Sequence, residues 1–309
     1  MDASAFITQQ TLTAAVPLLL AGTGELVAER TGTINIGIEG LMLTGCAAGY
    51  ITLALTGSGA LALGAAVLAG VLLAGLFALV CVWWRADQIV TGTALNLLAM
   101  GLTATAWMAV QNHLATTASL SPFTRLAIPG LSELPWIGPV LFQHYTLTYL
   151  LGLLLLGVWF KLRYTRAGLI LRALGDSPDA CAAAGVNVRL WRTGALLFAG
   201  ACAGAAGAYL ATMRTFSFSP DMTGGQGFLV LALVIFGRWT LPGLIAGALL
   251  FGALDALQQY FQGMPLARQI PYQAFKMLPY LVTLLALALL KSKRGGPAKL
   301  GTPWPEDRA

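Results

Sequence analysis

Asn35 and Glu39 are the polar side chains best placed to bind a solute, because they stand in a glycine-rich stretch at the start of a long apolar run. They are four positions apart, so on a helix they would share one face. The four glycines of residues 29–45 disfavour one continuous helix there. Polar, glycine-broken backbone at membrane depth is tolerated where it is buried in protein or lines a water-filled cavity. We therefore predict a transport pathway at this stretch. The alternative is a solvated loop in which Glu39 has no special role.

Other side chains could contribute to the same pathway, because a flat polar solute needs amide or hydroxyl partners and aromatic faces. The candidates of these types within or beside apolar runs are Asn96, Phe216, Phe218, Gln226, Asp255 and Gln258. Asp255 and Gln258 are three positions apart and would share a helical face. Each polar candidate could instead form a hydrogen bond between helices, worth ~0.6 kcal/mol on average.

Several kinds of chemistry find no support in the sequence. It lacks a Gly-x-x-x-x-Gly-Lys-Ser/Thr loop, so energy for transport must come from another subunit or from an ion gradient. No Ser-His-Asp or Gly-x-Ser-x-Gly pattern indicates a hydrolase. His113 and His144 have no neighbouring ligand cluster, so we expect no metal site. The four cysteines lack paired spacing, which favours free thiols over disulfides.

The composition is that of a membrane protein. Hydrophobic residues make up 57 % of the 309 residues and charged residues 10 %, with a mean hydropathy of +0.76, whereas a soluble domain has roughly 25 % charged residues. Several uncharged runs exceed the ~20 residues that cross ~30 Å of hydrocarbon. Only helices or closed barrels satisfy their backbone in lipid. We therefore predict an all-α polytopic membrane protein in a lipid bilayer. The net charge of +6 gathers at the ends of the apolar runs, which does not indicate a nucleic-acid partner.

The hydropathy pattern predicts about nine membrane segments, including glycine-broken half-spans. After a first span at 11–28, the second runs from the Asn35–Glu39 stretch to a turn at 56–59. The others are expected at 60–84, 88–111, 145–160, 193–213, 226–237 (a half-span), 240–260 and 269–290. Residues 112–144, with four prolines, are expected to form an external loop. We assign residues 1–290 to a single transmembrane domain.

Basic residues set the expected orientation. The loop at 161–192 and the tail at 291–309 are the most basic connections, so the positive-inside rule places both in the cytoplasm. The N-terminus is then outside and the C-terminus inside. In this topology residues 11–111 and 193–290 have the same order of segments in opposite orientations. Such inverted repeats, with paired broken segments, are typical of transporters.

Two stretches resemble a known family. Residues 29–40 (ERTGTINIGIEG) and 171–188 (LRALGDSPDACAAAGVNV) are similar to the signatures of permease subunits of bacterial ABC importers for branched-chain amino acids, simple sugars and nucleosides. The form Asn-Ile-Gly-Ile-Glu-Gly is similar to that of the nucleoside-type branch. Asp176-Ser177 stands where the family usually has Glu-Asn, and Cys181 where it usually has Ala. The resemblance spans most of residues 11–290.

The resemblance implies a type II ABC importer fold and a function as the membrane-spanning subunit of an ATP-driven importer in the bacterial inner (cytoplasmic) membrane. The solute would be a nucleoside, with simple sugars or branched-chain amino acids as alternatives. The implied partners are an ATP-binding cassette ATPase, a second homologous permease or a second copy of the chain, and an external solute-binding protein. The chain itself would bind no cofactor, because ATP and Mg would sit on the ATPase, and it would not be an enzyme.

The resemblance also assigns a role to the basic loop, as the helix that couples the ATPase to the membrane subunit. Ser177-Pro178 has the pattern of an N-cap and a first-turn proline, and predicts a short helix over 179–184 that ends at Gly185. The residues expected to contact the ATPase are Asp176, Ser177, Pro178, Asp179, Ala180, Ala183, Gly185 and Val186. An ordinary capped connector is the alternative.

Two rival functions belong to other classes. A free-standing secondary transporter driven by an ion gradient would need an ion-coupling carboxylate in the bundle, which Glu39 or Asp255 could supply. An integral membrane enzyme would need a catalytic constellation, and the sequence offers none.

Overall fold

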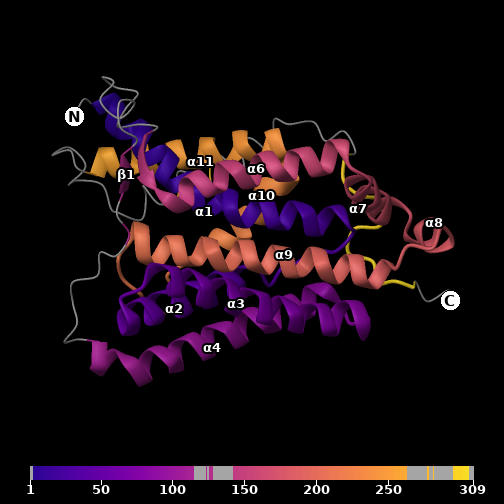
Figure 1. Ribbon diagram of the computed structural model, residues 1–309, viewed down its shortest axis with the longest axis horizontal. Helices are drawn as coiled ribbons and strands as arrows, with labels where there is room; N and C mark the ends of the chain where they lie inside the picture. Colours follow the sequence, from indigo (N-terminus) through magenta and orange to yellow (C-terminus); the bar gives the residue numbers. More distant parts are fainter. Residues whose placement is uncertain are drawn as a thin grey trace.

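Figure 1 shows a bundle of long helices that run along one common direction. The computed structural model describes residues 3–114, 123, 125–127, 142–262, 277, 281 and 295–305. Within them, seven helical segments are long and apolar enough to cross a membrane. They are α1 (Ala3–Arg30), α2 (Ile38–Thr56), α3 (Gly59–Ala78) continued by η1 (Leu79–Trp83), α4 (Gln88–Leu114), α6 (Thr146–Tyr164), α9 (Val188–Tyr209) continued by η2 (Leu210–Arg214), and α11 (Leu241–Gln262).

An eighth apolar helix, α10 (Gln226–Phe236), has only 11 residues. At 1.5 Å per residue it is about 16 Å long, roughly half the hydrocarbon thickness. It confirms the half-span predicted at 226–237. The polytopic helical fold is also confirmed, with one addition: β1 (Arg125–Ala127) and β2 (Gln143–Tyr145) form a short antiparallel pair.

Some expected segments fall outside the described part of the chain. Most of the predicted span at 269–290, of which only residues 277 and 281 are described, and most of the predicted external loop at 112–144 lie there. The total of nine segments, the single domain and the inverted repeats therefore stay predictions.

Helix α9 lies at the centre of the bundle and packs against α1, α2 and α3 (Figure 1). Helix α1 packs on another side of α9 and contacts α10 and α11. Helix α4 lies along α2 at the periphery, and most of its surface is exposed, as is that of α6. The apolar faces of α4 and α6 are therefore the surfaces left for lipid or for a partner protein.

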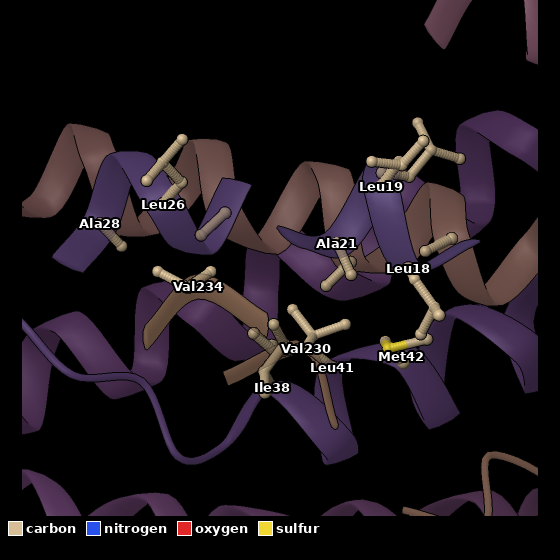
Figure 2. Close-up of a cluster of buried hydrophobic side chains, with 14 of the residues drawn as sticks. Leu18, Leu19, Ala21, Leu26, Ala28, Ile38, Leu41, Met42, Val230 and Val234 are labelled. Carbon is tan, nitrogen blue, oxygen red and sulfur yellow. The ribbon is translucent and has the colours of Figure 1, made fainter. Parts of the chain in front are cut away.

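The half-span α10 is held between α1 and α2 by apolar side chains (Figure 2). Val230 and Val234 of α10 are fully buried in one cluster with Leu26 of α1 and with Ile38 and Leu41 of α2. In lipid this packing stabilises through close van der Waals contact, because lipid chains are as apolar as the side chains. A short helix that lacks the length to span is thus fixed by its neighbours.

Glycines let α2, α3 and α9 touch backbone to backbone. A Cβ atom on Gly204 would lie 2.2 Å from the carbonyl oxygen of Ala66 in α3, and one on Gly207 would lie 2.1 Å from that of Met42 in α2. Gly200 likewise faces Gly70 of α3. The Gly200-xxx-Gly204 spacing therefore marks a helix contact, as small-residue spacing in membranes commonly does.

One end of the bundle carries most of the basic residues. There α7 (Arg166–Asp176) and α8 (Pro178–Ala183) extend beyond the long helices, together with residues 295–305, while the N-terminus lies at the opposite end (Figure 1). The guanidinium of Arg30, at the end of α1, donates to the carbonyl oxygen of Trp239, which follows α10. The ends of α1 and α10 therefore lie together at this basic end.

Replacing Gly204 with alanine is expected to destabilise the fold, because the new Cβ would overlap a backbone oxygen that has no side-chain freedom to move. Overpacking of this kind costs roughly 1–3 kcal/mol. Thermal unfolding of the detergent-solubilised protein should show a lower midpoint for Gly204→Ala. Gly64→Ala is the matched control, since no atom lies within 4 Å of a Cβ at Gly64. Equal midpoints for the two variants would contradict the close-packing account.

Candidate functional site

The loop at residues 31–37 is a non-helical stretch whose backbone is satisfied by buried side chains. The N–H of Ile34 donates to the Oε1 of Gln88 at 2.8 Å, and the N–H of Asn35 donates to the Oε1 of Glu25 at 3.1 Å. Gln88 and Glu25 are themselves buried. Non-helical backbone inside a membrane protein needs such partners, because no solvent is present to supply them.

Asn96 of α4 supports the start of α2. Its Oδ1 accepts from the N–H of Gly40 at 2.8 Å, and its Nδ2 donates to the carbonyl oxygen of Ile36 at 3.0 Å. The N–H groups of the first turn of a helix have no partner within the helix. The Asn96 amide therefore takes the place of an N-cap, from a helix 56 residues away in the chain.

Glu39 joins the two glycine-broken segments. One carboxylate oxygen accepts from the N–H of Gly225 at 2.8 Å, and the other accepts from the N–H of Gly227 at 2.6 Å. These N–H groups belong to the first turn of α10, where a negative charge is favoured by the helix dipole. Gly227 is required for the contact, because a Cβ there would lie 2.6 Å from the Cα of Glu39. The contact holds the first turn of the half-span α10 on α2.

A cavity of about 450 Å³ opens beside this contact. Its lining residues come from α2, α4, the segment before α10 and α10 itself: Glu39, Gly40, Leu43, Thr93, Asn96, Leu97, Met100, Asp221, Gly225 and Phe228. Its volume lies in the range of small-molecule sites. Leu97 and Phe228 are largely exposed, so the cavity is open on the face of the bundle that α4 borders. Buried carboxylate and amide groups thus meet an open, solute-sized space.

A second, more polar cavity of about 420 Å³ lies across residues 222–226 from the first, among α1, α10 and α11. Arg214 and Asp255 form an ion pair in its wall, and the Nε2 of Gln259 donates to Asp255 at 2.8 Å. Gln226 and Gln258 also line it. Residues 221–227, which we call the neck, therefore lie between the two cavities.

An aromatic cluster stands nearer the N-terminal end of the bundle. The ring of Phe218 lies 5.4 Å from that of Trp107 and 6.5 Å from that of Tyr50, centroid to centroid. Phe216, in contrast, is 45 % exposed, and it lines a third cavity with Arg214. Both phenylalanines border the segment that leads into α10.

Helix α8 has two faces of different character. Pro178 and Cys181 are buried against α7 and α9, where Cys181 joins Leu174 and Val188. Asp179, Ala180, Ala183 and Gly185 are exposed. The outward face is therefore small and flat. Burial also raises the pKa of the Cys181 thiol above its ordinary value, so the thiol is neutral.

The ends of α8 differ slightly from the prediction. The helix covers 178–183 rather than 179–184. Ser177 is the N-cap and Pro178 lies in the first turn, as predicted, but the Ser177 hydroxyl makes no capping hydrogen bond. Gly185 ends the helix as predicted, with a φ of +82° that favours glycine.

Residues 7–287 match the family described as the branched-chain amino acid transport system permease component. The chain belongs to this family. It is 34 % identical over 305 residues to the guanosine ABC transporter permease protein NupQ of Bacillus subtilis, with 96 % of each chain covered. It is 36 % identical over 274 residues to a putative glucose ABC transporter permease protein, TsgC13, of Haloferax volcanii, with 86 % of this chain and 81 % of that one covered.

A third relative is the nucleoside ABC transporter permease protein NupC of Lactococcus lactis, which is 32 % identical with 93 % of each chain covered. No solved structure matches this chain significantly. The membership in a permease family agrees with the polytopic helical fold.

In this permease the predicted pathway residues fall into separate places. Glu39 and Asn96 line the cavity beside α4, whereas Gln226, Asp255 and Gln258 line the polar cavity on the other side of the neck. Phe216 and Phe218 lie on the approach to α10. Asn35 is fully buried beside Glu25 and is not among the residues that line the described cavities.

Several site residues were missed. Gln88 holds the backbone of Ile34. Thr93 and Asp221 line the cavity beside Glu39, and Arg214 pairs with Asp255. Tyr50 and Trp107 surround Phe218. Arg214 carried a usable signal, because a charge at the end of an apolar run calls for a partner within the bundle. The others are ordinary residues of spans, and only the fold brings them together.

Substituting Glu39 with glutamine should loosen α10, since one oxygen acceptor is replaced by an NH₂ group that faces a backbone N–H. A hydrogen bond to a charged group is worth about 1.5–3 kcal/mol. Hydrogen exchange at the amides of Gly225 and Gly227 is expected to accelerate. Asp221→Asn removes a charge from the same cavity without touching these amides and serves as the control. Equal exchange in Glu39→Gln and the unsubstituted protein would refute the capping role.

Proposed function

We propose that this chain is the membrane-spanning permease subunit of an ATP-driven ABC importer and that its solute is a nucleoside. The observation that carries the proposal is the similarity over nearly the whole of both chains to a guanosine permease. A nucleoside permease matches over nearly the full length as well. The importer would stand in the cytoplasmic membrane.

The cavity beside Glu39 would form half of the pathway. Asn96 and Asp221 supply polar groups and Phe228 an aromatic face, which are the features that a flat, polar base and its ribose need. Because the cavity is open beside α4, a second permease, homologous or identical, would close it from that side. The exposed apolar surface of α4 is available for that contact.

The ATPase would dock on α8, and an external solute-binding protein would dock at the opposite end. An alanine-rich outward face fits into a groove of a partner without steric hindrance. ATP and Mg would be bound and used by the ATPase, and the permease would contribute no cofactor. The basic residues gather at the α8 end, which the positive-inside rule places in the cytoplasm, with the N-terminus outside.

The contacts of the two candidate carboxylates support the importer over ion-gradient coupling. Asp255 is paired with Arg214, and Glu39 accepts from two backbone N–H groups, so both carboxylates already have partners within the chain. Glucose is the second candidate solute, because the relative at 36 % identity is a putative glucose permease.

Transport by the reconstituted complex tests the proposal. The chain, produced with a candidate ATPase, second permease and binding protein, should take up labelled guanosine in an ATP-dependent way. Excess unlabelled uridine or adenosine should compete, whereas glucose should not. Competition by glucose alone would assign the sugar instead. Uptake that needs no ATP and follows a proton or sodium gradient would overturn the importer proposal.

A bulky residue on the outward face of α8 should release the ATPase. In Ala183→Trp the indole would stand where the partner must approach, and we expect at least a tenfold loss of ATPase recovered with the tagged permease, equivalent to about 1.4 kcal/mol. Ala60→Trp, an exposed alanine at the opposite end of the bundle, is the control. Normal recovery with Ala183→Trp would show that docking occurs elsewhere.

A further inference from the structure

Residues 295–305 run across the basic end of the bundle and form hydrogen bonds with the end of α7 and with α8. The N–H of Lys299 donates to the carbonyl oxygen of Gly175 at 2.8 Å, and the N–H of Ala298 donates to the Oδ1 of Asp176 at 3.2 Å. Gly175 has no room for a side chain, because a Cβ there would lie 2.8 Å from the ring of Pro297. The segment therefore lies directly on the end of α7.

The indole of Trp304 extends this contact to α8. Its Nε1 donates to the Oδ1 of Asp179 at 2.8 Å, and its ring packs on the cluster that contains Leu174 and Cys181. A residue from the far end of the chain thus packs beside the buried side of α8 and bonds to Asp179 on its exposed side.

The same segment also bonds to the loop at 31–37. The N–H of Gly301 donates to the carbonyl oxygen of Gly32 at 2.9 Å. The guanidinium of Arg192 joins the loop to the segment. Its Nε donates to the carbonyl oxygen of Thr31 at 3.1 Å, and its Nη1 donates to the carbonyl oxygen of Thr302 at 3.0 Å. A Cβ on Gly32 would lie 3.0 Å from the carbonyl oxygen of Lys299, so the two backbones touch.

We propose that residues 297–304 form a strap that positions the coupling helix and transmits its movement to the 31–37 loop. Six residues separate Gly32 of this loop from Glu39, which holds the first turn of α10. A displacement of α8 would therefore reach the half-span without passing along a whole transmembrane helix. The end of α7 also packs on Arg30, and the strap adds bonds on both sides of that contact. The inference rests on the proposed function, since it assigns Trp304 and its neighbours a positioning role for the same importer.

Removing the strap by truncation tests whether it transmits the movement of α8 or only helps the ATPase to bind. A chain that ends at Arg294 lacks the strap, and a chain that ends at Pro305 retains it and is the control. In the assembled importer we expect the ATPase to stay bound, ATP hydrolysis to change less than about twofold, and ATP used per solute to rise about tenfold or more, because the five hydrogen bonds of the strap described above are lost. An unchanged ratio, or loss of the ATPase from the complex, would overturn the proposal.

Hydrogen exchange on the permease alone gives a readout that does not depend on the proposed function. Truncation at Arg294 should accelerate exchange at the amides of residues 225–229, which the strap does not touch. A local tether would change only the exchange of the segments that residues 295–305 contact, which are 31–34, 174–180 and the turn at Trp239, and that result would contradict transmission. Trp304→Phe keeps an aromatic ring but loses the hydrogen bond to Asp179. It should raise both the ATP used per solute and the exchange rate at residues 225–229 by about three- to tenfold, as for the loss of one hydrogen bond. If the unsubstituted chain recruited no ATPase, the importer proposal would fail while this exchange test still decided the strap.

Discussion

The rest of the structure depends on the contact between the Glu39 carboxylate and the first turn of α10. A half-span must begin inside the hydrocarbon, where its unpaired N–H groups and any free carboxylate would each be costly. Bringing the two together satisfies both, since each oxygen accepts one N–H from Gly225 or Gly227. The contact then forces other features: glycine at 227, a non-helical approach at 31–37, and partners for that approach from α1 and α4.

This arrangement places two cavities beside α10, which is too short to cross the membrane. The cavity next to Glu39 and the polar cavity beside Arg214 lie on either side of one short, glycine-rich neck. Moving α10 by a small amount would change the shape of both. A rigid-body displacement of this kind is the usual way in which transporters expose a site alternately to the two sides of the membrane. At the basic end of the bundle, the strap contacts both α8, through Trp304 and Asp179, and the start of the 31–37 loop, through Gly301 and Gly32.

The fold was largely predictable, because long uncharged runs leave helices as the main solution, and a glycine-rich break before a short apolar run predicted α10. Glu39 and Asn96 could be chosen as candidates from their type and their place at or within apolar runs, and their role in transport stays a prediction. Their partners could not be predicted, since the bonds to Gly225, Gly227, Ile36 and Gly40 depend on packing across the bundle. The capping pattern placed Ser177 and Pro178 correctly at the start of α8, although the Ser177 hydroxyl makes no capping hydrogen bond. The strap was beyond prediction: a basic tail with prolines and glycines gives no periodic signal, and its contacts are mostly backbone groups.

Thiol labelling of the cavity tests the central claim most directly. The four native cysteines are buried, so a cysteine placed at Asp221 would be the main target of a membrane-impermeant reagent. The account predicts that Asp221→Cys in the assembled importer is labelled, that guanosine delivered by its binding protein slows the labelling, and that ATP changes the side from which the reagent reaches it. Leu153→Cys, on the exposed apolar face of α6, should stay unlabelled. If Asp221→Cys were unreactive from both sides in every state, the contact between Glu39 and α10 would be a structural joint away from the solute pathway.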